Sequence, residues 1–160
     1  MQERAIVPFF QPIVQLEDGV SIGHEVLGRS RFFGLESPMA MFRAASQLNL
    51  EVELSRMFRW KGMHASTDLA DAPLIFMNTH PIELGEPGLL DSMKHVRDEY
   101  SDRPMVLEID EAAATDPVAM KELRDSLNEL DVRLAYDDFG SGQTRMRGQR
   151  FWGHPAQGKS

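Results

Sequence analysis

The sequence contains no cysteine, which excludes a disulfide framework and a thiolate metal site. No apolar run approaches the roughly 18 residues needed to cross a bilayer, and the first residues lead straight into a strand-like segment rather than a signal peptide. The formal net charge of -8 at pH 7 argues against sequence-independent binding to a nucleic-acid polymer. We therefore expect a cytoplasmic protein that engages no membrane.

Acidic residues are also missing from the C-terminal segment, residues 145–160. This segment carries four basic residues, and its glycines and prolines interrupt any helical or strand-like period. The sequence therefore predicts one domain over residues 1–144, long enough for a hydrophobic core, followed by an irregular tail over residues 145–160. A changed reading frame or an early stop is the alternative origin of the tail.

The rest of the chain alternates strand-like and helix-like segments. Residues 6–14 and 21–29 are joined by a short turn signal and predict an antiparallel hairpin. Further strands are expected at residues 73–80, 104–111 and 132–140, and helices at 39–49, from 50 onward, at 88–100 and at 117–130. Strand followed by helix, repeated with a near-constant step, predicts βαβ units and a parallel sheet. The side chains expected near one stripe of the second helix, facing the core, are Leu50, Leu54, Met57, Phe58 and Trp60 or Lys61.

Polar residues interrupt the apolar strands at regular intervals. Asn78, Glu108 and Asp137 follow apolar runs at steps of about thirty residues; Asp138 comes next, and Glu25 holds a comparable place in the hairpin. The carboxyl ends of the strands are where α/β barrels carry their chemistry. Oxygen-only ligands favour hard divalent ions, and two such ions can clamp a phosphodiester. Taken singly, an aspartate after a strand is more often a turn residue or a helix cap.

Short motifs stand in a fixed order along residues 6–144. They are QPIV at 11–14 with EVLGR at 25–29, FMN at 76–78, LEIDE at 107–111 and DDFGSG at 137–142. In this order they resemble the motifs of EAL domains, of which DDFGSG is the most specific. Val26 replaces the usual alanine of the triplet that gives the family its name.

The resemblance implies both a fold and an activity. The fold would be a TIM-like (β/α) barrel with an antiparallel first strand, incomplete here because about five of its eight strands are accounted for. The activity would be that of a cyclic di-GMP phosphodiesterase in bacterial second-messenger signalling. Such a domain hydrolyses cyclic di-GMP to the linear dinucleotide with two Mg²⁺ or Mn²⁺ ions.

The resemblance also implies roles for individual residues. The expected metal ligands are Glu25, Asn78, Glu108, Asp137 and Asp138. Three of them are expected to be catalytic: Glu25, Asp137 and Asp138.

A second group of residues would contact the dinucleotide rather than the metal. These are Gln11, Leu27 and Arg29, and the forked guanidinium of Arg29 suits a phosphate. Glu111 would hold the loop 138–142 in its metal-ready conformation.

The sequence departs from the family pattern in several places. Asp110 stands where threonine is common, and residues 143–145 (QTR) replace the usual aromatic and serine residues of the loop. The later strands of the family supply a lysine and a further glutamate, but no glutamate follows Glu129, and Lys159 is the only lysine after the aspartate pair.

Three functions therefore stay open at the level of sequence. The first is the phosphodiesterase, and the second is a catalytically inactive EAL module that binds cyclic di-GMP or a protein. The third is another barrel enzyme with carboxylate-bound Mg²⁺, such as one that stabilises an enolate, against which the QPI and DDFG matches argue. A homodimer or a regulatory protein domain is the partner that the resemblance allows.

Overall fold

The computed structural model describes residues 5–15 and 17–137 of the chain. Its strands are β1 (Ile6–Val14), β2 (Ser21–Ser30), β3 (Ile75–Asn78), β4 (Met105–Asp110) and β5 (Val132–Asp137). Its helices are α1 (Pro38–Ser46), α2 (Glu51–Ser66), α3 (Gly88–Glu99) and α4 (Pro117–Glu129), with short 3-10 turns η1 (Pro81–Gly85) and η2 (Glu111–Ala113). The predicted order of strands and helices is confirmed. The predicted tail and the boundary at residue 144 lie outside the described residues.

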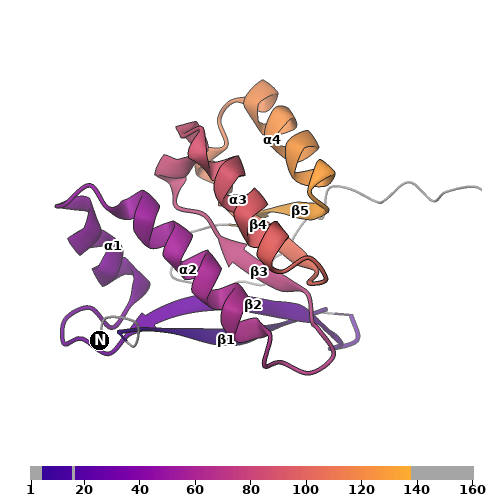
Figure 1. Cartoon of the computed structure of the whole chain (residues 1–160), viewed down its shortest axis with the longest axis horizontal. Helices are drawn as coiled ribbons and strands as arrows, with labels where there is room; N and C mark the ends of the chain where they lie inside the picture. Colours follow the sequence, from indigo (N-terminus) through magenta and orange to yellow (C-terminus); the bar gives the residue numbers. More distant parts are fainter. Residues whose placement is uncertain (1–4, 16, 138–160) are drawn as a thin grey trace, which may run out of the picture.

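The strands form one sheet in the order β1-β2-β3-β4-β5. β1 pairs with β2 antiparallel, as the hairpin signal predicts, and each later strand pairs parallel with the one before it. Figure 1 shows α2, α3 and α4 following one another across one face of this sheet, and each helix contacts the next. All the carboxyl ends of β2 to β5 therefore lie along one edge.

Local capping explains where two helices begin. The Ser37 hydroxyl accepts the Ala40 N–H at 3.2 Å, and Pro38 follows as the first residue of α1. The carboxylate of Asp116 accepts the N–H groups of two residues in the first turn of α4, at 3.0 and 3.2 Å. Both starts agree with the sequence prediction.

The strands β3 and β4 are buried on both faces of the sheet. The larger core lies on the helix side, where residues of β3, β4 and β5 pack against α3 and α4. On the opposite face Phe76, Val106 and Ala135 form a second buried layer from three adjacent strands. The residues two positions further along these strands are Asn78, Glu108 and Asp137. Because strand side chains alternate between faces, these polar residues continue the same face as the buried layer.

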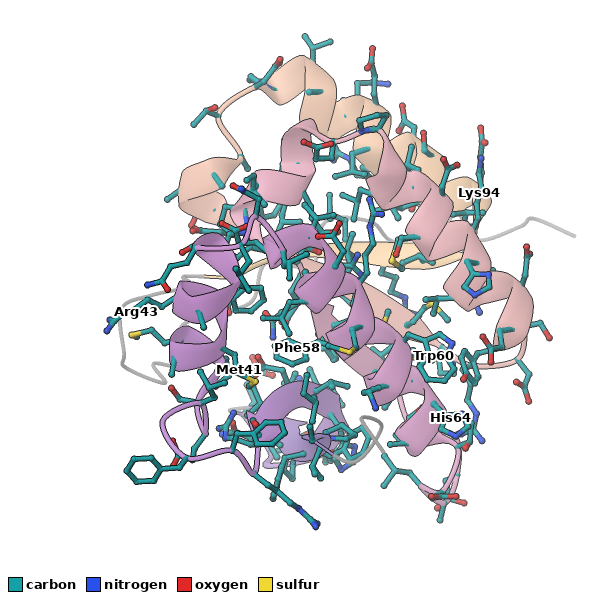
Figure 2. The ribbon with its side chains drawn as sticks, turned by 60° about the vertical axis from the view of Figure 1, so that its left-hand side comes forward. Met41, Arg43, Phe58, Trp60, His64 and Lys94 are labelled. Atoms are coloured by element: carbon teal, nitrogen blue, oxygen red, sulfur yellow. The ribbon has the colours of Figure 1, made fainter. Side chains whose placement is uncertain are left out.

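The predicted core face of α2 is partly wrong. Leu54 is buried and Phe58 packs in the small cluster under α1, but Leu50, Met57 and Trp60 are 44%, 37% and 36% exposed. In Figure 2 Phe58 lies on the side of α2 that faces α1, and Trp60 lies beside His64. The other residues that α2 buries are Ser55, Arg59, Gly62, Met63 and Ser66.

The prediction differs from the structure because α2 packs against the rest of the fold partly through small and charged residues rather than through apolar ones alone. A Cβ atom at Gly62 would come within 2.4 Å of the Val26 side chain, so glycine allows α2 to approach β2 closely. Arg59 is buried because it forms an ion pair with Glu83. Neither feature follows the apolar periodicity on which the prediction was based.

Candidate active site

Three carboxylates from three strands meet at the edge of the sheet. Glu25 on β2, Glu108 on β4 and Asp137 on β5 each offer an oxygen atom, and these atoms lie within 4.8 Å of one another. Glu108 is only 2% exposed, whereas the other two are half-buried. The structure thus brings together three of the five predicted metal ligands.

Asn78 on β3 completes this edge between β2 and β4. Its Nδ2 donates a hydrogen bond of 2.8 Å to Glu25 Oε1, across 53 residues of sequence. It stands directly opposite Glu108 in the β3–β4 register. Since its amide nitrogen is engaged with Glu25, its carbonyl oxygen is the atom that would serve a cation. The fifth predicted ligand, Asp138, lies outside the described residues.

The electrostatics of the cluster favour a bound cation. Burial raises the pKa of the Glu25 carboxyl above its ordinary value, and the negative charge of Asp137 raises it further. The hydrogen bond from Asn78 and the positive charge of Arg29 oppose this rise in pKa. The ionised Glu25 carboxylate therefore lowers the stability of the fold, because it is buried and close to another negative charge. A bound divalent ion would offset this repulsion.

A substitution at Glu25 tests this cost. A carboxyl whose folded pKa is raised contributes stability below its unfolded value, about 4.5 here, and loses it as the pH rises through the folded pKa. In EDTA at pH 7 we therefore expect Glu25→Gln to raise the Tm, with the gain disappearing below pH 4.5. Thermal unfolding followed by circular dichroism across this pH range measures both, with the exposed Glu122→Gln as control. A lower Tm for Glu25→Gln at pH 7 would contradict the electrostatic account.

The predicted ligand-contacting residues lie next to the carboxylates. Gln11 on β1 is exposed and stands opposite Glu25 in the antiparallel register. Leu27 and Arg29 follow Glu25 at alternate positions of β2, so all three share one face of the sheet. The Arg29 guanidinium donates to the Gly28 carbonyl at 2.9 Å. These positions place the three residues along the same edge of the sheet as the carboxylate cluster.

The two acidic residues after Glu108 have different positions. Glu111 is exposed at the first residue of η2, and the loop that it would hold lies outside the described residues. Asp110, which departs from the family pattern, accepts the Ala112 N–H at 2.8 Å and so caps η2. This carboxylate therefore serves the turn after β4.

A pocket that the sequence did not reveal adjoins the cluster. Its lining residues are Val26, Leu27, Gly28, Pro38, Phe42, Ser55, Phe58, Arg59, Met77, Asn78, Thr79 and His80. The walls are mainly apolar, and the His80 ring stacks on Phe42 with centroids 4.7 Å apart. Two of its buried polar atoms, Thr79 Oγ1 and Arg59 Nε, have no hydrogen-bond partner within the described part of the chain. Helix α1 supplies part of the wall through Pro38 and Phe42.

His80, two residues after Asn78, lies in the wall of this pocket. Burial lowers the pKa of its imidazole, and the charges of Glu51 and Glu83 oppose that lowering. Its Nδ1 accepts the Ile82 N–H at 3.4 Å, so His80 also caps η1. We assign His80 to the pocket wall rather than to the carboxylate cluster.

Comparison with known proteins identifies this arrangement of strands and acids. The family model of the EAL domain matches residues 1–150. The chain belongs to the EAL domain family. EAL domains form TIM-like barrels, so the predicted fold class is confirmed, and the five described strands correspond to part of such a barrel.

Two curated relatives resemble this EAL domain over most of its length. MucR of Pseudomonas aeruginosa, a bifunctional diguanylate cyclase/cyclic di-GMP phosphodiesterase, is 27% identical over 91% of this chain and 23% of its own length. PdeG of Escherichia coli, a probable cyclic di-GMP phosphodiesterase, is 30% identical over 88% of this chain and 30% of its own. The chain thus spans less than a third of the curated relatives it matches.

Solved EAL domains show the same fold. The P. aeruginosa MucR phosphodiesterase in complex with cyclic di-GMP superposes with a TM-score of 0.73 at 28% identity, covering 88% of this chain and 63% of that one. The FimX EAL domain of P. aeruginosa bound to cyclic di-GMP gives a TM-score of 0.67 at 26% identity, covering 86% and 58%. Klebsiella pneumoniae BlrP1, in a manganese and cyclic di-GMP complex, shares the fold at 21% identity and a TM-score of 0.67.

Proposed function

We propose that this EAL domain belongs to a cyclic di-GMP phosphodiesterase and carries the larger part of its metal site. One observation supports this proposal above the others: oxygens of Glu25, Glu108 and Asp137, from three strands of the sheet, lie within 4.8 Å of one another. The two curated relatives are described as a bifunctional diguanylate cyclase/cyclic di-GMP phosphodiesterase and a probable cyclic di-GMP phosphodiesterase.

The donor set fits a hard divalent ion. All three carboxylates and the Asn78 carbonyl offer oxygen, the ligand type that Mg²⁺ and Mn²⁺ prefer. The predicted pair of Mg²⁺ or Mn²⁺ ions belongs to this proposal, with Asp138 as a further ligand. When bound, such ions lower the pKa of a coordinated water and offset charge on a phosphodiester.

The residues of the chain would bind and orient the dinucleotide. Arg29 lies four residues after Glu25 on the same face of β2, and its guanidinium suits a phosphate. Leu27 lies between them on the same face of β2, where its apolar side chain can contact a base. Gln11 faces Glu25 from β1, and Glu111 would act through the loop after Asp137. Glu25, Asp137 and Asp138 keep the catalytic role that the family resemblance implies.

A second candidate function is binding without cleavage. Gln11, Leu27 and Arg29 supply contacts for a dinucleotide that do not depend on turnover. The FimX EAL domain, 26% identical to this chain, is described as bound to cyclic di-GMP.

No helix in residues 5–15 or 17–137 is long and apolar enough to span a membrane. A cytoplasmic location and a homodimeric or regulatory partner remain predictions.

The test combines metal binding with product analysis. Mn²⁺ affinity is measured by titration calorimetry, and cyclic di-GMP incubated with Mn²⁺ is followed by chromatography for the linear product. We expect Glu25→Ala to weaken Mn²⁺ binding by about 100-fold, because it removes one ligand and the acceptor of the Asn78 hydrogen bond. The exposed Glu122→Ala on α4 is the matched control and should bind as the wild type does.

The outcomes separate the two functions. Linear product that disappears in Glu25→Ala supports the phosphodiesterase. Dinucleotide binding without product supports the second candidate. A folded wild type that binds neither Mn²⁺ nor the dinucleotide contradicts both.

A further inference from the structure

A buried ion pair connects α2 with the turn after β3. The Arg59 side chain, fully buried, donates to both carboxylate oxygens of Glu83 at 2.8 and 2.7 Å. Glu83 belongs to η1 and is itself fully buried. A second contact of Arg59 reaches Ser92 on α3 at 3.3 Å. The forked guanidinium thus holds three elements in one relative orientation.

The same guanidinium reaches the exit of β3 through a serine. Arg59 Nη1 donates to Ser55 Oγ at 3.0 Å, one turn earlier on α2. Ser55 Oγ also accepts the backbone N–H of His80 at 3.1 Å. His80 lies two residues after Asn78, at the point where β3 leaves the sheet. The backbone just beyond Asn78 is therefore fixed by a hydrogen bond that it donates to Ser55 of α2.

Asn78 transmits this restraint to the carboxylates. Its side chain donates to Glu25 at 2.8 Å, and the next residue, Thr79, donates its N–H to the Glu108 carbonyl at 3.0 Å. A shift of the β3 exit would move the Asn78 amide relative to Glu25. Metal affinity is sensitive to such displacements, because supporting hydrogen bonds orient the ligands.

Stability alone does not account for the pair. Replacing a buried ion pair by apolar residues of similar volume is often neutral or stabilising, because removing two charges from water is costly. An apolar pair would fill the space between α2 and η1 but would not donate to Ser55. What the arginine adds is a directed hydrogen bond to Ser55.

We propose that Arg59, held by Glu83, is a positioning residue that fixes the exit of β3 and thereby the Asn78 ligand of the metal site. This inference rests on the proposed function, because it assigns a role to Arg59 in metal binding. It concerns residues outside the carboxylate cluster.

The test replaces the pair by apolar residues in the full chain. In the double variant Arg59→Met/Glu83→Leu we expect the Tm to stay the same or rise. Exchange of the His80 amide, followed by NMR, should become about 10-fold faster, and Mn²⁺ affinity should fall by about 10-fold. Arg56→Met is the matched control, because Arg56 also lies on α2 and contacts Glu83, at 3.9 Å, whereas the hydrogen bond to Ser55 comes from Arg59. It should change neither His80 exchange nor Mn²⁺ affinity.

A second variant covers the case in which the double variant does not fold. Arg59→Lys keeps the charge but loses the forked geometry, and it should show the same two changes in smaller measure. Unchanged His80 exchange in the folded variants would overturn the proposal, as would faster exchange with unchanged Mn²⁺ affinity. A folded wild type that binds no Mn²⁺ contradicts the proposed function instead. His80 exchange then still decides whether the pair fixes the β3 exit.

Discussion

Replacing Arg59 alone with methionine is expected to lower the free energy of unfolding by about 3–5 kcal/mol. The substitution leaves the fully buried Glu83 carboxylate without either of its two short hydrogen bonds from Arg59. The remaining cation, Arg56, approaches one Glu83 oxygen only at 3.9 Å and is 38% exposed. Leaving a buried charge without a close partner is among the few changes that destabilise a protein this much.

Urea denaturation followed by circular dichroism measures the effect. Arg56→Met is again the control, because the Arg56 side chain is 38% exposed and a contact as long as 3.9 Å contributes about 0–1 kcal/mol. Equal losses in the two arginine variants would contradict the assignment of the ion pair to Arg59.

The double variant should recover most of this loss. Arg59→Met costs stability chiefly because of the charge that it leaves behind, so the added change Glu83→Leu removes the cause. The two substitutions are therefore expected to be strongly non-additive, with a coupling of about 2 kcal/mol or more. Additive effects would mean that Arg59 and Glu83 act separately, which their contacts at 2.7 and 2.8 Å do not favour.

The edge of the sheet was predictable from the sequence because strands have a simple period. Apolar runs of three or four residues precede Asn78, Glu108 and Asp137, and the structure places all three at or near the carboxyl ends of β3, β4 and β5. The helix starts were equally readable, since Ser37 and Asp116 form local caps that depend on only three or four residues. Local rules of this kind need no knowledge of the rest of the fold.

Contacts between distant residues were not predictable in the same way. Arg59 and Glu83 are 24 residues apart, and nothing in the helix pattern of α2 marks an arginine as a core residue. A charged residue in an amphipathic helix is ordinarily expected on the solvent face, so the buried face of α2 was misassigned. Only the fold supplies the carboxylate that makes burial of this charge tolerable.

The candidate site shows the same division. That Glu25 and Asn78 share an edge follows from strand order, but their hydrogen bond of 2.8 Å depends on the register between β2 and β3. The pocket depends on α1, whose Phe42 turns toward His80 rather than into the sheet. Register and helix placement are set by tertiary packing, which a single sequence does not display.

Replacing Arg97 with alanine is expected to lower the free energy of unfolding by about 3 kcal/mol, for a reason confined to the other end of the strands. The five backbone carbonyls to which its guanidinium donates are those of Tyr100, Ser101, Arg103, Leu130 and Asp131, at 2.7 to 3.3 Å. These carbonyls follow α3 and α4 and lead into β4 and β5, where the end of a helix leaves carbonyls without intrahelical partners. Of the five, Tyr100 also accepts the Arg103 N–H at 3.3 Å. Asp131 itself has a φ of 54°, so this turn is held in an unfavourable backbone conformation.

Lys94→Ala is the matched control, one turn earlier on α3. Its side chain is 60% exposed and meets Asp91 only at 4.0 Å, so we expect a loss of less than about 0.5 kcal/mol. Urea denaturation gives both values, and similar losses for Arg97 and Lys94 would contradict the role assigned to the guanidinium. Because Arg97 acts where β4 and β5 begin, the folded Arg97→Ala chain should keep the Mn²⁺ affinity of the wild type. It would thus lose stability with the metal site intact, whereas Arg59→Met/Glu83→Leu would keep stability and lose metal affinity.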